Sequence, residues 1–279
     1  MIVFLNGQFV LEEQATVSVF DRAFLYGDGL FETMRVVNGK PFRWWDHMER
    51  LRKGGDFLGI KIPFACKSLE KFAAELIAQN KMPDALMRIT VSRGIGPRGY
   101  SPKGADKPTL VMSLHPATGT TVSQSVSWKL VTSSHRLPAG DALAQFKTAN
   151  KLAQVLARAE ADAAGADEAL LCNTDGFVAE GASSNLFWIE SGTVCTPPLA
   201  SGILAGVTRA VTVEICKQLG LSVAERQITP GKLLRADGVF LTLSSLGVVE
   251  ASALDGESLG RSAIATTIHH AYEKLLREG

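Results

Sequence analysis

Three features between residues 146 and 209 could together perform chemistry on an amino group. Lys147 lies just ahead of a predicted helix, Glu180 follows in an otherwise uncharged run, and Gly206-Val207-Thr208 leads straight into another predicted helix. A lysine partly removed from water has a nucleophilic amine that can react with an aldehyde. Backbone N–H groups at a helix N-terminus bind anions such as phosphate. This combination is what an enzyme needs to hold an aldehyde cofactor that carries a phosphate.

Each of these features also has an ordinary structural explanation. Lys147 could be a surface lysine, although no acidic partner lies near it in the sequence. Glu180 could be a surface turn acid, or a carboxylate that keeps a cofactor ring nitrogen protonated. Thr208 could simply cap its helix. The three features favour a cofactor site in combination, and none of them does so alone.

Further candidates lie outside this stretch. Arg50, in His47-Met48-Glu49-Arg50-Leu51, is either a solvated helix charge or the cation that neutralises a phosphate. Ser244 and Ser245 end a predicted buried strand and offer hydroxyl and amide donors, or form a plain polar turn.

Composition restricts the class of protein. The 29 basic and 28 acidic residues nearly cancel, so neither nucleic acid nor a membrane surface is expected as a partner, and a small-molecule substrate is. The four cysteines form no CxxC pair, which argues against a zinc cluster or disulfide framework, and we expect no metal. The N-terminus lacks a basic signal-peptide region, and no run reaches the ~20 apolar residues of a membrane helix. We therefore expect a cytoplasmic protein.

The chain of 279 residues, 46% of them hydrophobic, is large enough for two packed domains. Residues 137–146 include Pro138-Ala139-Gly140-Asp141-Ala142 and show no periodicity, so they are the predicted linker. We expect an N-terminal α+β domain over residues 1–136. A C-terminal cofactor-binding domain is expected over residues 147–279.

The hydrophobic pattern predicts an α+β fold in which strands outnumber helices. Asn6-Gly7 between two short apolar runs predicts an N-terminal hairpin. Strands do not alternate strictly with helices, which argues against a doubly wound parallel sheet. Gly27-Asp28-Gly29 and Gly94-Ile95-Gly96 lack the third glycine of a dinucleotide-binding motif. The predicted strands are residues 2–5, 8–11, 30–37, 85–92, 109–114, 125–131, 168–172, 177–179, 185–190, 193–196, 222–226 and 238–243, and the predicted helices are residues 43–58, 69–79, 150–164, 207–219 and 261–277.

These motifs resemble those of the fold type IV pyridoxal phosphate enzymes, the class of branched-chain aminotransferases, D-amino-acid aminotransferases and aminodeoxychorismate lyases. The similarity runs from Leu5-Asn6-Gly7 to about Val249. It implies a small N-terminal α+β domain, a larger C-terminal domain with a β-barrel-like sheet core, and a homodimer with pyridoxal 5'-phosphate between domains. By the same resemblance, Lys147 binds the cofactor covalently and Glu180 pairs with its pyridine nitrogen. The phosphate-binding residues would be Arg50, Gly206, Val207, Thr208, Ser244 and Ser245.

Three sequence features on the substrate side resemble the lyases most. Residues 92–101, which end in Arg98-Gly99-Tyr100-Ser101, are similar to the lyase Arg-Gly-Tyr loop and would place Arg93, Arg98 and Tyr100 near a substrate with two carboxylates. Residues 147–152 match a Lys-x-x-Asn-basic-Leu pattern, and residues 244–249 resemble the lyase turn. Some aminotransferases share the Arg-Gly-Tyr loop, and Val249-Glu250 departs from the sequence common after that turn.

The resemblance therefore favours a lyase that converts 4-amino-4-deoxychorismate to 4-aminobenzoate and pyruvate, a step of folate biosynthesis. Lys147 would remove the ring proton next to nitrogen. Thr33 would either supply a hydroxyl for proton transfer on the substrate side or be an ordinary strand threonine. The alternative is a transaminase acting on D-amino acids or branched-chain amino acids, with 2-oxoglutarate or pyruvate as acceptor. Arg98 would then bind the α-carboxylate of each substrate in turn.

Overall fold

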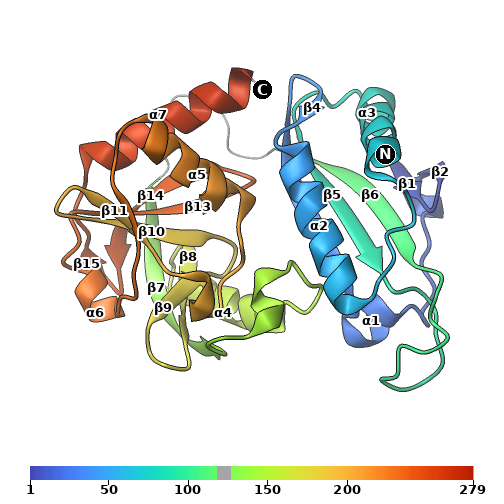
Figure 1. The fold of residues 1–279 in the computed structure, drawn as a ribbon, viewed down its shortest axis with the longest axis horizontal. Helices are drawn as coiled ribbons and strands as arrows, with labels where there is room; N and C mark the ends of the chain where they lie inside the picture. Colours follow the sequence, from blue (N-terminus) through green and yellow to red (C-terminus); the bar gives the residue numbers. More distant parts are fainter. Residues whose placement is uncertain (118–126, 279) are drawn as a thin grey trace. The chain divides into compact units, whose positions relative to one another are not determined.

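The computed structural model describes residues 1–117 and 127–278, and this part of the chain divides into two compact units (Figure 1). The first holds residues 1–117 and Phe146–Asn150, and the second holds residues 127–145 and 151–278. The division differs from the predicted domains. Strand β7 (Ser127–Leu137) belongs to the second unit because it pairs in parallel with two strands there. Residues 146–150 belong to the first unit because their backbone bonds to its strand β3 (Gly29–Val37).

The first unit is built on a six-stranded sheet in the order β2-β1-β6-β5-β3-β4, counted over the described residues. Its strands pair antiparallel throughout this order. Asn6 and Gly7 have positive φ at the β1–β2 turn, which confirms the predicted hairpin. The strands are β1 (Ile2–Leu5), β2 (Gln8–Leu11), β3, β4 (Lys40–Pro41), β5 (Ala85–Ser92) and β6 (Thr109–Pro116).

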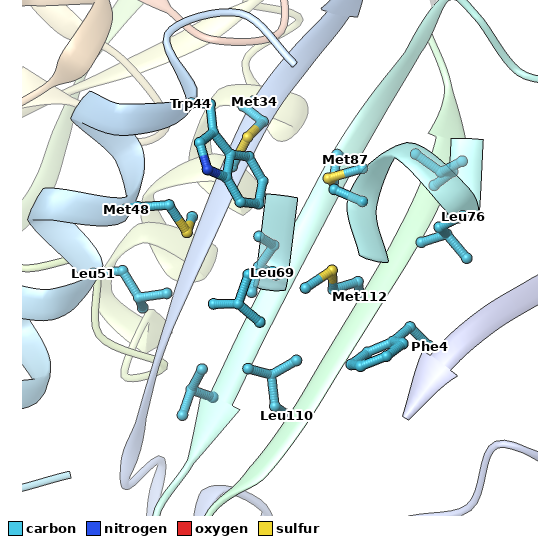
Figure 2. Close-up of a cluster of buried hydrophobic side chains, with 14 of the residues drawn as sticks. Phe4, Met34, Trp44, Met48, Leu51, Leu69, Leu76, Met87, Leu110 and Met112 are labelled. Atoms are coloured by element: carbon cyan, nitrogen blue, oxygen red, sulfur yellow. The ribbon is translucent and has the colours of Figure 1, made fainter. Parts of the chain in front are cut away.

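Two long helices of the first unit bury their apolar sides in a core shared with the sheet. Figure 2 shows Trp44, Met48 and Leu51 of one helix and Leu69 and Leu76 of the other among apolar side chains of the strands. Burial of such side chains supplies most of the driving force for this packing. The helices and short helical turns are η1 (Glu12–Gln14), α1 (Arg22–Tyr26), α2 (Trp44–Leu58) and α3 (Cys66–Asn80).

The second unit contains a curled sheet, with nine strands in the described residues, in the order β12-β11-β10-β13-β14-β7-β8-β9 and with β15 beside β14. Strand β9, at the end of this order, also contacts β10 near the other end, so the sheet curls into the predicted barrel-like core. The strands after β7 are β8 (Glu168–Asn173), β9 (Val178–Gly181), β10 (Asn185–Glu190), β11 (Thr193–Thr196), β12 (Val223–Glu225), β13 (Gly238–Leu243), β14 (Gly247–Leu254) and β15 (Glu257–Ser258).

Helices cover this curled sheet, with α4 against β7 and β8 and α7 against β14 (Figure 1). None of the helices in residues 1–117 and 127–278 has the length and apolar character that crossing a bilayer would need. All four cysteines are free thiols. The helices and helical turns are η2 (Ala142–Gln145), α4 (Leu152–Ala163), η3 (Leu199–Ser201), α5 (Val207–Gln218), α6 (Pro230–Leu233) and α7 (Ala263–Glu278).

The structure confirms the α+β fold and most predicted elements, with corrections at their ends. The predicted strand 125–131 begins outside the described residues, and its described part extends to Leu137. Glu180 lies inside β9 and not in a loop between strands. Helix α1 and strand β14 are among the elements that the pattern did not predict. Helix α1 has only five residues, which is too short for a hydrophobic period to be recognised.

Candidate active site

Lys147 lies in a segment that two backbone hydrogen bonds join to strand β3. The N–H of Phe31 donates to the carbonyl of Lys147 at 2.9 Å, and the N–H of Ala149 donates to the carbonyl of Gly29 at 2.9 Å. The Lys147 Nζ lies 4.7 Å from the centre of the Phe31 ring. The amine therefore has an apolar surface on one side, and its place depends on the first sheet.

The same ring contacts a second cation that the sequence did not single out. The guanidinium carbon of Arg88, on β5, lies 3.9 Å from the Phe31 ring centre. Burial lowers the pKa of Arg88, whose Nε donates to Thr90 Oγ1 at 3.2 Å. In the described part of the chain no carboxylate pairs with Arg88. Strand residues alternate between faces, so Thr33 lies on the Phe31 face of β3, opposite Arg88 in register.

Arg50 is part of a buried ionic cluster on α2 and β3. Its Nε donates to Glu32 Oε1 at 2.8 Å, its Nη2 donates to Glu32 Oε2 at 2.6 Å, and His47 Nδ1 lies 2.7 Å from Glu32 Oε2. Burial alone would raise the pKa of Glu32, but the charge and hydrogen bonds of Arg50, with those of His47, outweigh it and lower that pKa to about 2. Arg50 is therefore a positioned cation and not a solvated helix charge.

Glu180 is fixed by a loop and a neighbouring strand of the second unit. Its Oε2 accepts a hydrogen bond from the Leu204 N–H at 2.8 Å and a longer one from Asn185 Nδ2 at 3.4 Å. The same Asn185 Nδ2 donates to the Leu204 carbonyl at 3.0 Å. Glu180 is 8% exposed, so this carboxylate is held in one orientation inside the protein.

Helix α5 begins at Val207, three residues after Leu204, and has no side-chain cap. Gly206 occupies the N-cap position, so no side chain there accepts from the N–H groups of the first helical turn. Thr208 Oγ1 lies 3.4 Å from Ser244 Oγ, which belongs to the turn between β13 and β14. Ser245 follows in the same turn, and Val207 is buried at the start of the helix. The structure thus brings the predicted anion donors of the second unit together.

The three residues predicted to bind substrate occupy different environments. Arg93 is buried, and it donates to Asp28 Oδ2 at 2.7 Å and to the carbonyls of Leu58 and Gly59 at 2.8 Å and 3.1 Å. These contacts give Arg93 a role in the fold, because it joins the residue before β3, the C-terminal end of α2 and the end of β5. Arg98 and Tyr100 are exposed in the loop that follows, with Tyr100 87% exposed.

Comparison with known proteins identifies the family. Residues 29–254 match the family described as amino-transferase class IV. The chain is 34% identical to a putative branched-chain-amino-acid aminotransferase of Methanocaldococcus jannaschii over 98% of this chain and 95% of that one. It is 30% identical to a D-alanine aminotransferase of Bacillus licheniformis, covering 94% and 92%, and 30% identical to an aminodeoxychorismate lyase of Bacillus subtilis, covering 93% and 88%.

Solved structures agree with this assignment. The branched-chain amino acid aminotransferase of T.th. with pyridoxamine 5'-phosphate has a TM-score of 0.93 and 30% identity, covering 99% of this chain and 94% of that one. A putative 4-amino-4-deoxychorismate lyase from Legionella pneumophila has a TM-score of 0.88 and 30% identity, covering 95% and 98%. The chain belongs to the class IV aminotransferase family of pyridoxal phosphate enzymes.

The residues present fit a phosphorylated pyridine cofactor. The uncapped first turn of α5 and the hydroxyls of Thr208 and Ser244 form a donor set for phosphate. The Thr242 hydroxyl, in register with Asn185 on the neighbouring strand, is buried and has no hydrogen-bond partner among the described residues. A polar ligand would satisfy such a hydroxyl. Glu180 is an oriented carboxylate that would suit a ring N–H.

Gly206→Ala is expected to weaken cofactor binding about tenfold. A Cβ at this position would collide with Asn185 Oδ1, so Asn185 must move, and its contacts with Glu180 and Leu204 would be lost. Gly231→Ala is the matched control, because a Cβ there meets nothing within 4 Å. Titration of each apoprotein with pyridoxal phosphate measures the difference. Equal dissociation constants for the two variants would contradict the assignment of this region to the cofactor.

Proposed function

We propose that this protein is a pyridoxal-phosphate-dependent aminotransferase that moves an amino group from an amino acid to a dicarboxylic keto acid such as 2-oxoglutarate. Branched-chain amino acids are the proposed donors, because the relative with 34% identity carries that description. A homodimer and a cytoplasmic location belong to the same proposal. This replaces the lyase as the favoured reaction, since the branched-chain aminotransferase structure matches the backbone better than the lyase structure does.

The proposed roles follow from chemistry at named atoms. When bound, the cofactor supplies an aldehyde that takes up amines and a ring that withdraws electrons from the neighbouring carbon. Lys147 Nζ would attach the cofactor and then carry the proton between the substrate α-carbon and the cofactor. Glu180 would hold the ring N–H, and Arg50 with the α5 turn would bind the phosphate. Thr33, on the Phe31 face of β3, would assist the proton transfer by hydrogen bonding through its hydroxyl.

The observation that carries this proposal is the pair of cations on the Phe31 ring. Lys147 Nζ and the Arg88 guanidinium both lie over that ring, at 4.7 Å and 3.9 Å from its centre. A guanidinium without a carboxylate partner in the described residues suits a carboxylate of the ligand, which it can bind through two parallel hydrogen bonds. A substrate that reacts at Lys147 would therefore carry a carboxylate within reach of Arg88, as 2-oxoglutarate does.

The reaction type is tested by pairing amino donors with keto acids. The purified holoenzyme is supplied with L-leucine, L-valine, L-isoleucine, D-alanine or D-glutamate, each with and without 2-oxoglutarate, and the keto acid formed is measured. Turnover of the branched-chain donors only with 2-oxoglutarate is the expected result. Turnover restricted to the D-amino acids would move the donor class to that of the D-alanine aminotransferases.

The lyase is the second candidate, because the Arg-Gly-Tyr loop and residues 147–152 and 244–249 resemble the lyases and two of the compared proteins carry that description. The test is pyruvate release from 4-amino-4-deoxychorismate with no keto acid added. Release without an acceptor, together with no transamination in the donor panel, would replace the aminotransferase proposal by the lyase.

Arg88→Gln is expected to raise the KM for 2-oxoglutarate about tenfold or more, because a charged donor to the substrate carboxylate is lost. The KM for a branched-chain donor, which has one carboxylate fewer, should change much less. Steady-state kinetics with both substrates varied gives the two values. Arg52→Gln, at an exposed arginine on α2, is the control. Equal changes for donor and acceptor would assign Arg88 to the shared α-carboxylate and remove its role in choosing the acceptor.

A further inference from the structure

The Arg98-Gly99-Tyr100 segment is held by a buried arginine from a distant part of the sequence. Arg22, on α1, is 3% exposed. Its Nη1 donates to the carbonyls of Gly99 at 2.9 Å and Ser101 at 3.2 Å, and its Nη2 donates to the Tyr100 carbonyl at 3.0 Å. One guanidinium thus binds three consecutive carbonyls, so the backbone of this segment has little freedom to rotate.

Tyr26 holds the same segment through its hydroxyl and its ring. The Gly99 N–H donates to the Tyr26 hydroxyl at 3.2 Å, and the Tyr26 and Tyr100 rings meet edge to face with centres 5.5 Å apart. Arg22 and Tyr26 lie one helical turn apart, and the Arg22 guanidinium also lies 4.9 Å from the Tyr26 ring centre. Gly99 has φ 108°, which only glycine adopts readily, and this lets its N–H and its carbonyl reach the two partners.

Arg22 is itself fixed by a partly buried acidic residue. Its Nε donates to Asp28 Oδ2 at 2.8 Å, and Arg93 donates to the same oxygen at 2.7 Å. Burial would raise the pKa of Asp28, but the hydrogen bonds and charges of Arg93 and Arg22 outweigh it and lower that pKa. Asp21 caps α1 through the Ala23 N–H at 2.8 Å. Helix α1 is therefore anchored before it contacts the loop.

We propose that Arg22 and Tyr26 are positioning residues that hold the Arg98-Gly99-Tyr100 backbone so that the exposed Arg98 and Tyr100 side chains are presented to substrate in one arrangement. The inference rests on the proposed function together with the sequence prediction that Arg98 of this loop binds the α-carboxylate of each substrate. Side chains on a fixed backbone lose less freedom on binding, so the binding is stronger than from a mobile loop. Neither residue touches substrate in this account.

Two conservative variants test the proposal in the full-length holoenzyme. Arg22→Lys keeps a positive charge beside Asp28 but cannot bind three carbonyls, and Tyr26→Phe keeps the ring but loses the hydroxyl that accepts from Gly99. Limited trypsin digestion reports directly on opening of the loop, because the Arg98–Gly99 bond that trypsin cuts lies in it. Both variants are expected to be cut there about tenfold faster than the wild type, since cleavage follows the population of the opened loop. Mass spectrometry identifies the cut.

The second readout is kinetic and separates positioning from a general loss of fold. Each variant is expected to raise the KM for the amino donor about tenfold with a smaller change in kcat, the pattern of lost substrate binding. Adding Arg98→Ala should leave little further effect of Arg22→Lys, because residues that act through one another are not additive. Arg52→Lys, at an exposed arginine on α2, is the matched control and should leave both readouts at the wild-type values.

The outcomes distinguish this proposal from the proposed function. Unchanged cleavage at Arg98 in both variants would overturn the inference, whatever the enzyme catalyses. Faster cleavage with an unchanged KM for every substrate would also overturn it, because the loop would then be held without serving substrate. Absence of transamination by the wild type in every donor and acceptor pair would instead overturn the proposed function. The cleavage rates would still show whether Arg22 and Tyr26 hold the loop.

Discussion

Lys147→Ala is expected to abolish transamination, with a loss of at least about 10³-fold in rate. It should also remove the visible absorption band of the covalently attached cofactor. The reason is that Lys147 Nζ is proposed both to attach the cofactor and to carry the substrate proton. Backbone bonds of the Lys147 carbonyl and the Ala149 N–H hold this segment to β3, so the alanine variant should keep its fold. Absorption spectra and steady-state rates measure the two effects.

Lys53→Ala is the control for this loss. Lys53 is an exposed lysine on α2, where its contact is with Glu49 at 3.6 Å, so its removal should leave both the spectrum and the rate unchanged. A Lys147→Ala protein that keeps the absorption band and the activity would show that another amine binds the cofactor. Partial recovery of the rate on addition of methylamine would support a proton-carrying role, since a small amine can take the vacated place.

Glu32→Gln is expected to destabilise the first unit by about 3 kcal/mol at neutral pH, and the difference from wild type should shrink in acid. Glu32 has a folded-state pKa of about 2, below its ordinary value of 4.5. A depressed carboxyl pKa stabilises the fold at pH values above 4.5, and this stabilisation is lost as the pH falls from 4.5 toward 2. The variant has no carboxylate to protonate, so it lacks this part of the acid sensitivity.

The measurement must report on the first unit alone. Pulsed hydrogen exchange after equilibration in urea at several pH values follows α2 and β3 separately from the second unit. Glu49→Gln is the matched control on α2, because its ion pair with Arg52 is exposed and contributes little. Equal pH dependence for the wild type and Glu32→Gln would refute the argument. The same variant should bind pyridoxal phosphate more weakly, because Arg50 loses the partner that orients it.

Much of the fold was predictable because its long elements have clear local signals. Helix α2 and strand β5 carry the hydrophobic periods that the sequence shows, and the Asn6-Gly7 turn selects its hairpin. Helix α1 was not predictable in this way. It is defined by the Asp21 cap and by Arg22 contacts to residues more than 70 positions away, and no local pattern encodes such contacts.

The residues of the candidate site likewise differ in whether a short sequence motif points to them. Lys147, Glu180 and the α5 turn could be proposed from the sequence because short motifs carry them. Arg88 was missed, because an arginine in an alternating strand looks like any outward-facing residue until the Phe31 ring is placed beside it. A substrate role for Arg93 stays a prediction from its position in the sequence. Its neighbours in the Arg-Gly-Tyr loop suggested substrate, whereas its partners are Asp28 and the end of α2.

Residues 146–150 belong to the first unit although they follow strand β7 of the second unit in the sequence. This has a consequence for how the protein is made. During synthesis the first sheet emerges early, but the segment that bonds to Gly29 and Phe31 follows the β7 strand of the second unit. The first unit therefore cannot be completed until the ribosome has passed residue 150. Because domains generally fold as they are made, the lysine segment should be among the last parts of that unit to dock. A chain cut anywhere before residue 146 would lack both the docking segment and the reactive amine.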